Sequence, residues 1–268
     1  MNMLRTNNPV LNERAFDPDQ AWGNLERDAA RPKVMTLNGT ILASLVLLGL
    51  SVATAVVCWT LFQQQPGLLL VGTMGGSLLG LVLTMICCFK PAASPFLATP
   101  VAICQGALAG GLSVFWSGYV AAKSGEGVVG SLGTGLVLQA SILTVGVAAC
   151  MLIAYATRLI RATERFKLGV VAATGGILLL SLASMVLRMF GVQIPFLWDN
   201  GPIGIGFAGV VVVIAALNLV LDFDFIEQGV EAGLPRHMEW YAGIGLLVTL
   251  VWLYVSILRL LAMLSSRR

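Results

Sequence analysis

Charged residues are scarce in this chain. Only 11% of the 268 residues are Asp, Glu, Lys or Arg, and 57% are hydrophobic. A soluble domain carries about 25% charged residues, so this chain has less than half the usual number of charges to face water. The mean hydropathy of +0.89 points the same way. Composition therefore excludes a soluble globular domain and a disordered chain, and it predicts a polytopic membrane protein.

Several kinds of chemistry are also excluded by what is missing. His237 is the only histidine, and the five cysteines all lie in apolar stretches without metal-ligand or redox spacing. The chain has no dense run of Lys or Arg, so nucleic acid is not an expected partner. An intramembrane aspartyl protease needs an aspartate on each of two helices, and the last apolar stretch contains none. We therefore expect no enzyme activity, no metal and no cofactor.

Long apolar runs are abundant, and a spanning helix needs about 20 such residues. None of the runs contains Asp, Glu, Lys or Arg, and their continuous apolar character favours helices over a barrel. The seven runs are residues 41–62, 67–89, 97–121, 132–156, 168–187, 202–221 and 241–258. The sequence thus predicts an all-α transmembrane bundle of seven helices over residues 37–268, preceded by a polar cytoplasmic tail over residues 1–36.

Lys and Arg placement predicts the orientation, because cytoplasmic loops of membrane proteins are enriched in these residues. With seven spans and a cytoplasmic tail, eleven of the 16 Lys and Arg residues lie on the cytoplasmic side and five on the other. The predicted N-terminus is cytoplasmic. Arg267 and Arg268 fit this scheme poorly, so an even number of spans with one re-entrant segment is the alternative.

The sixth apolar run leads directly into three acids, Asp222, Asp224 and Glu227. We expect the helix to end here, where its dipole already presents partial negative charge. One interpretation is a solvated helix end; the other is a carboxylate that faces the bundle interior and senses protons or cations. Residues two apart point about 200° from each other on a helix, so Asp222 and Asp224 cannot both face inward.

Other polar residues lie deeper in the predicted helices, and all are neutral. They are Gln105, Gln139, Asn218, Thr249 and Ser256. Interhelical hydrogen bonds explain such residues in membrane bundles. The alternative is a polar pore lining, for which Gln105, Asn218 and Ser256 are the candidates. Small residues repeat every four positions at Gly72, Gly76 and Gly80 and at Gly106 and Gly110, which predicts seams of close helix packing.

Several segments together resemble the Bax inhibitor-1/YccA family (transmembrane Bax inhibitor motif proteins), in its bacterial subgroup with a long N-terminal tail. They lie in the same order along nearly the whole chain. They are Asn8-Pro9-Val10-Leu11, Met35-Thr36-Leu37-Asn38-Gly39-Thr40, Thr163-Glu164-Arg165-Phe166, Leu221-Asp222-Phe223-Asp224-Phe225-Ile226-Glu227, Met238-Glu239-Trp240-Tyr241 and Ile257-Leu258-Arg259-Leu260-Leu261. The resemblance implies a seven-helix fold with the last helix in the middle.

The resemblance also implies a pH-dependent calcium leak, controlled by a hydrogen-bonded pair of aspartates on the last two helices. Asp222 matches the first aspartate, whereas Thr249 stands at the position of the second. Ser256 and Gln105 likewise stand where a Glu is usual. The candidate ion- and proton-sensing residues are therefore Asp222, Asp224 and Thr249, without the second carboxylate.

Two functions from different classes follow from the resemblance. The first is a leak for calcium or protons across the lipid bilayer, gated by the acids at the end of the sixth helix. The second is a regulator of membrane-protein quality control or stress that conducts nothing and acts on a membrane protease or another membrane protein. Ion flux through the purified protein distinguishes the first from the second.

Overall fold

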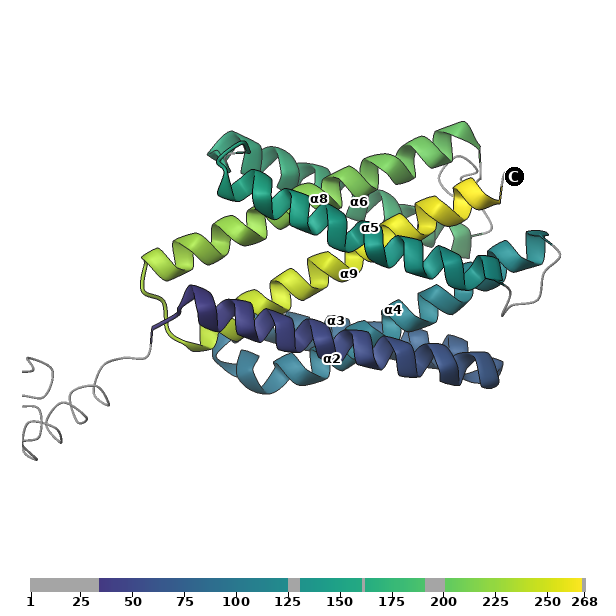
Figure 1. Ribbon diagram of the computed structural model, residues 1–268, viewed down its shortest axis with the longest axis horizontal. Helices are drawn as coiled ribbons and strands as arrows, with labels where there is room; N and C mark the ends of the chain where they lie inside the picture. Colours follow the sequence, from purple (N-terminus) through teal and green to yellow (C-terminus); the bar gives the residue numbers. More distant parts are fainter. Residues whose placement is uncertain (1–33, 125–130, 161, 191–200, 267–268) are drawn as a thin grey trace, which may run out of the picture. The chain divides into compact units, whose positions relative to one another are not determined.

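The computed structural model describes residues 34–124, 131–160, 162–190 and 201–266 (Figure 1). Helices contain 91% of these residues, and no strand occurs among them. Seven of the helices are long and apolar enough to cross a membrane, as the sequence predicts. They are α2 (Leu37–Gln64), α3 (Pro66–Phe89), α4 (Ser94–Ser124), α5 (Ser131–Ala156), α6 (Glu164–Met189), α8 (Pro202–Glu231) and α9 (His237–Ser265). A short 3-10 turn, η2 (Pro91–Ala93), joins α3 to α4.

Local chemistry explains several helix ends. The Thr36 hydroxyl caps α2 by accepting a hydrogen bond from the Gly39 N–H at 3.0 Å. Pro66 and Pro202 occupy the first positions of α3 and α8, where a missing N–H costs nothing. Gly233 follows α8 with a φ of +62°, a left-handed conformation that glycine adopts without strain.

The sequence prediction for the end of the sixth span was wrong. The predicted helix ends near residue 221, but α8 continues for ten more residues to Glu231. Phe223, Phe225 and Ile226 continue the apolar pattern, and no proline interrupts the helix before Gly233. Asp222 and Asp224 therefore lie inside α8, and neither meets the dipole at its C-terminal end.

The last helix, α9, lies in the middle of the bundle. It packs against α2, α4, α5 and α8, and in Figure 1 it runs between the group α5, α6 and α8 and the group α2, α3 and α4. On one side, Leu253 and Leu258 of α9 meet Leu219 of α8. On the other side, Leu247 of α9 meets Leu47 of α2. The central position that the resemblance implied is confirmed.

The two rows of glycines form seams inside the bundle, as predicted. A Cβ at Gly110 of α4 would lie 2.5 Å from the Ala55 carbonyl oxygen of α2. A Cβ at Gly80 of α3 would lie 3.0 Å from Cys104 of α4. Only a hydrogen atom fits at such contacts, so glycine lets the backbones approach closely.

The outward faces of the helices carry large apolar side chains. Val71 and Leu78 of α3 and Ile142 of α5 are more than 60% exposed, as are Leu178 and Leu179 of α6. A soluble monomer rarely exposes apolar surface on this scale. In a bilayer the same surface faces the lipid chains.

Candidate functional site

Asp222 lies at the interface between α8 and α9. The Thr249 side chain on α9 is its polar neighbour and interacts with the carboxyl group. Thr249 also donates a hydrogen bond to the Gly245 carbonyl oxygen of its own helix, at 3.2 Å. The Asp222 Oδ2 atom is shielded from solvent and has no hydrogen-bond partner. A shielded carboxylate oxygen of this kind is costly unless it gains a proton, a cation or a water molecule.

The length of α8 allows Asp222 to lie at membrane depth. The 30 residues of α8 make a helix of about 45 Å, which exceeds the roughly 30 Å hydrocarbon core by about 15 Å. Asp222 lies ten residues, or about 15 Å, before the Ala232 cap. If the excess length is divided equally between the two ends, Asp222 lies inside the core and Glu227 lies at its boundary. The solvated helix end considered for this acidic segment therefore fits Glu227 and does not fit Asp222.

Apolar packing closes the bundle beside Asp222. Leu219 lies three residues earlier on α8 and has no exposed surface. Ala215, Leu253 and Ile257 continue the same packed cluster toward the other end of α8 and α9, and each is at most 4% exposed. Tightly packed apolar side chains therefore fill the α8–α9 interface on this side of Asp222.

Asp224 points away from Asp222, as the helical geometry predicts. Its carboxylate forms an ion pair with Lys167 of α6 at 2.8 Å and accepts a hydrogen bond from Gln228 at 2.5 Å. Lys167 also pairs with Glu164 at 3.1 Å. Asp222 thus faces α9, and Asp224 connects α8 to α6.

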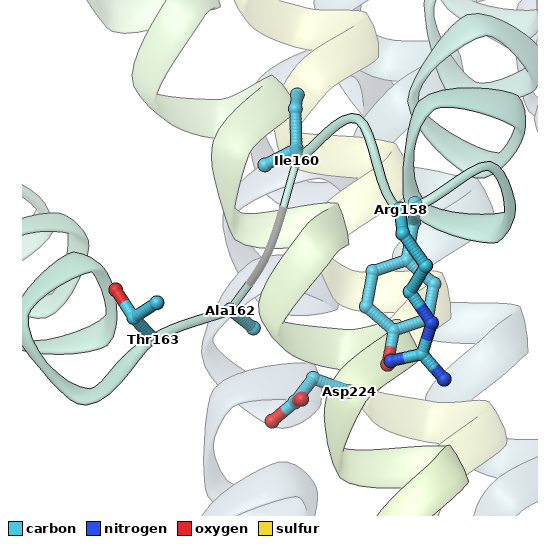
Figure 2. Close-up of a pocket in the computed structure, with 6 residues that line it drawn as sticks. Arg158, Ile160, Ala162, Thr163 and Asp224 are labelled. Carbon is cyan, nitrogen blue, oxygen red and sulfur yellow. The ribbon is translucent and has the colours of Figure 1, made fainter.

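An open pocket of about 430 Å³ lies beside Asp224, between α8 and the α5–α6 connection. Figure 2 shows Arg158, Ile160, Ala162 and Thr163 around it, with the Asp224 side chain at its lower edge. Arg158 forms an ion pair with Glu227 at 2.6 Å, and the Tyr155 hydroxyl donates to the same carboxylate. The charges at this end of the helices are therefore largely neutralised by one another.

The predicted pore-lining residues do not gather into one site. Asn218 donates a hydrogen bond to the Thr174 hydroxyl of α6 at 2.8 Å, so it faces a different helix from Asp222. Ser256 is buried and donates to the Trp252 carbonyl oxygen within α9. Gln105 is half-buried on α4 beside Gly106. The Asn218 bond supports the interpretation as an interhelical hydrogen bond, whereas the Ser256 bond stays within one helix.

Among the described residues, no group of three His, Cys, Asp or Glu side chains is placed to hold a metal ion. Ca²⁺ takes six to eight oxygen ligands in a stable protein site. A carboxylate such as Asp222, with one hydroxyl beside it, can attract a cation but cannot build such a shell from the side chains described.

Glu239 is a buried carboxylate that the sequence analysis passed over. It lies in the first turn of α9, is 4% exposed and contacts the first turn of α2. Its Oε1 accepts hydrogen bonds from the Thr36 N–H at 3.0 Å and the Thr36 hydroxyl at 2.9 Å. The sequence shows an acid just after a loop, which is typical of a solvated residue. In the sequence, the helix-capping residue type of Thr36 and the glycine at position 39 were the only signals that Glu239 has a partner there.

The fold and its apolar outer surface define an integral, multi-pass membrane protein with seven spanning helices. A family model described as Bax inhibitor 1 like matches residues 8–266, nearly the full length of the chain. The chain belongs to this family. Neither the search of curated proteins nor the search of solved structures found a match.

Proposed function

We propose that this protein is a passive pathway for cations, calcium or protons, with Asp222 as its gating carboxylate. The observation that carries the proposal is the shielded, unpartnered Asp222 Oδ2 at membrane depth in the interface of α8 and α9. Ionisable groups at this depth are costly and are associated with ion and proton pathways. The apolar packing around Leu219 and Leu253 makes the described structure the closed form.

Gating would follow the charge of Asp222. An ionised carboxylate attracts a cation into the bundle, and protonation removes that attraction, so flux should rise as the pH rises. Thr249 takes the place of a second carboxylate, so no proton is shared between two acids. A coupled carboxylate pair titrates in two separated steps, whereas a single acid titrates in one.

The same proposal includes the orientation and the membrane. The excess of Lys and Arg on one side supports a cytoplasmic N-terminus, and the resemblance to the bacterial subgroup supports the inner membrane. The Asp222 end of α8 then faces the cytoplasm. The proposal includes no catalytic step.

Reconstitution of the purified protein into liposomes with a calcium-sensitive dye, between roughly pH 6 and 8, tests the pathway. The wild-type flux should rise with pH, and Asp222→Asn should flatten this dependence because it removes the ionisable carboxylate of the proposed gate. Asp224→Asn is the matched control on the same helix, since its partner is Lys167 of α6. If Asp224→Asn flattens the profile and Asp222→Asn does not, Asp222 is not the gate.

A second function is favoured by one observation, the neutral Thr249 beside Asp222. Without a carboxylate pair, the protein could act as a non-conducting regulator of membrane-protein quality control or stress, through a membrane protease or another membrane protein. A regulator would show no flux at any pH and would co-purify with a partner after crosslinking in the native membrane. A protein that conducts by itself contradicts this alternative.

A further inference from the structure

The first residues of the membrane domain are attached to the hairpin formed by α8, residues 232–236 and α9. The Met35 N–H donates a hydrogen bond to the Leu234 carbonyl oxygen at 2.6 Å. The Met35 side chain is 2% exposed and packs with Ile226 of α8 and Ala242 of α9. Its sulfur lies close against Gly229, where a Cβ would be 3.1 Å away. The start of α2 is therefore fixed to both arms of the hairpin.

The Glu239 carboxylate is the polar centre of this attachment. One oxygen, Oε1, accepts both the N–H and the hydroxyl hydrogen bond of Thr36. The other, Oε2, lies 3.6 Å from Arg236 Nε, a weaker contact with a guanidinium that is largely exposed. A Cβ at Gly39 would overlap the carboxylate, so the α2 backbone is shaped around this group. The carboxylate also lies at the N-termini of α2 and α9, where helix dipoles favour negative charge.

We infer that Glu239 is a positioning residue that clamps α2 to the α8–α9 hairpin and thereby limits how often this end of the hairpin opens. Ile226 lies one helical turn after Asp222, so the clamp acts on the segment of α8 that carries the proposed gate. Only the consequence for ion flux rests on the proposed function. The clamp itself is independent of whether the protein conducts.

Thiol accessibility tests the clamp in the full-length protein in lipid nanodiscs, with the five native cysteines replaced by alanine. The probe is Ala242→Cys, which is buried against Met35. The matched control is Ala98→Cys near the start of α4, which is equally buried and lies at the same end of the bundle, because Ser94 contacts the His237 carbonyl oxygen. Each probe is combined with wild-type Glu239, Glu239→Gln or Glu239→Met, and its rate of reaction with a polar maleimide is measured.

Glu239→Met removes both acceptors and leaves the Thr36 donors unpaired, so the Ala242→Cys thiol should react at least about tenfold faster. Glu239→Gln retains an acceptor oxygen and should restore most of the protection. The Ala98→Cys thiol should not change. Equal rates at Ala242→Cys with and without Glu239→Met overturn the inference, and so does an equal rise at Ala98→Cys, which would indicate general loosening.

If Glu239→Met does not yield folded protein, Thr36→Val removes the hydroxyl donor of the same hydrogen bond, and Thr36→Ser, which keeps the hydroxyl, is its control. Flux measured on the same variants separates the two proposals. Faster labelling together with raised flux supports both the clamp and the pathway. Faster labelling in a protein that never conducts supports the clamp and contradicts the pathway, whereas unchanged labelling in a conducting protein overturns the clamp alone.

Discussion

At the scale of single residues, the buried carboxylate of Glu239 and the half-buried carboxylate of Asp222 have opposite surroundings. Glu239 accepts two hydrogen bonds and lies at two helix N-termini, so its charge is well compensated. Asp222 has a hydroxyl neighbour and one oxygen without a partner. Compensated charge fixes structure, whereas uncompensated charge responds to protons and ions. This contrast is the reason for assigning them different roles.

A substitution at Gly39 tests the surroundings of Glu239. Gly39→Ala places a methyl group where the Glu239 carboxylate lies, and we expect a loss of about 1–3 kcal/mol in unfolding free energy, as for other overpacked sites. Gly49→Ala is the control in the same helix, because open space surrounds Gly49 and alanine is the better helix former. Denaturant unfolding in detergent measures both. Equal stability of the two variants would contradict the described contact.

At the scale of helices, α6 depends on α8. Within the described residues its main packing partner is α8, and two polar contacts join them, Lys167 with Asp224 and Asn218 with Thr174. The outer face of α6 is exposed along most of its length. The attachment of α6 therefore depends on a few polar contacts along a single interface.

A double-mutant cycle measures one of these contacts. Thr174→Val and Asn218→Leu each remove one partner of the interhelical hydrogen bond, so their effects on unfolding free energy should not add. We expect a coupling of about 0.6 kcal/mol and at most about 1.7 kcal/mol, the range found for such bonds in membranes. Strictly additive effects would show that Asn218 does not bond to Thr174 in the membrane.

The glycine seam between α2 and α4 makes a prediction at the same scale. Gly110→Ala should cost about 1–3 kcal/mol, because the new methyl group would meet the α2 backbone at Ala55. Gly146→Ala on α5, where nothing lies within 4 Å of the added Cβ, should be neutral or slightly stabilising. Thermal unfolding of the two variants in the same detergent provides the comparison. Equal melting temperatures of the two variants would contradict the close contact between Gly110 and the α2 backbone.

At the scale of the whole molecule, the seven-span topology that we propose places the start of α2 and the end of α9 on opposite sides of the membrane. A reporter fused after Gln65, between α2 and α3, should be active only outside the cytoplasm. A reporter fused after Ala162, between α5 and α6, should be active only inside it. This direction is the one that the Lys and Arg distribution predicts. Both reporters active on the same side would contradict the seven-span topology, and a full reversal would contradict only the orientation.

The sequence by itself determined the class, the number of spans and the family. These follow from long uncharged apolar runs, since each run must satisfy its backbone hydrogen bonds as a helix in lipid. The glycine spacing also predicted the seams correctly, because the four-residue repeat places such residues on one helix face.

Only the tertiary structure decided which polar groups meet. The length of α8 beyond Leu221 places Asp222 inside the helix and not at its end, and the packing of α9 places Thr249 beside it. The contact between Glu239 and Thr36 joins residues 203 positions apart, and no local pattern marks such a pair. Periodicity fixes the face on which a side chain lies, but the helix that covers this face is selected by the packing of the entire bundle.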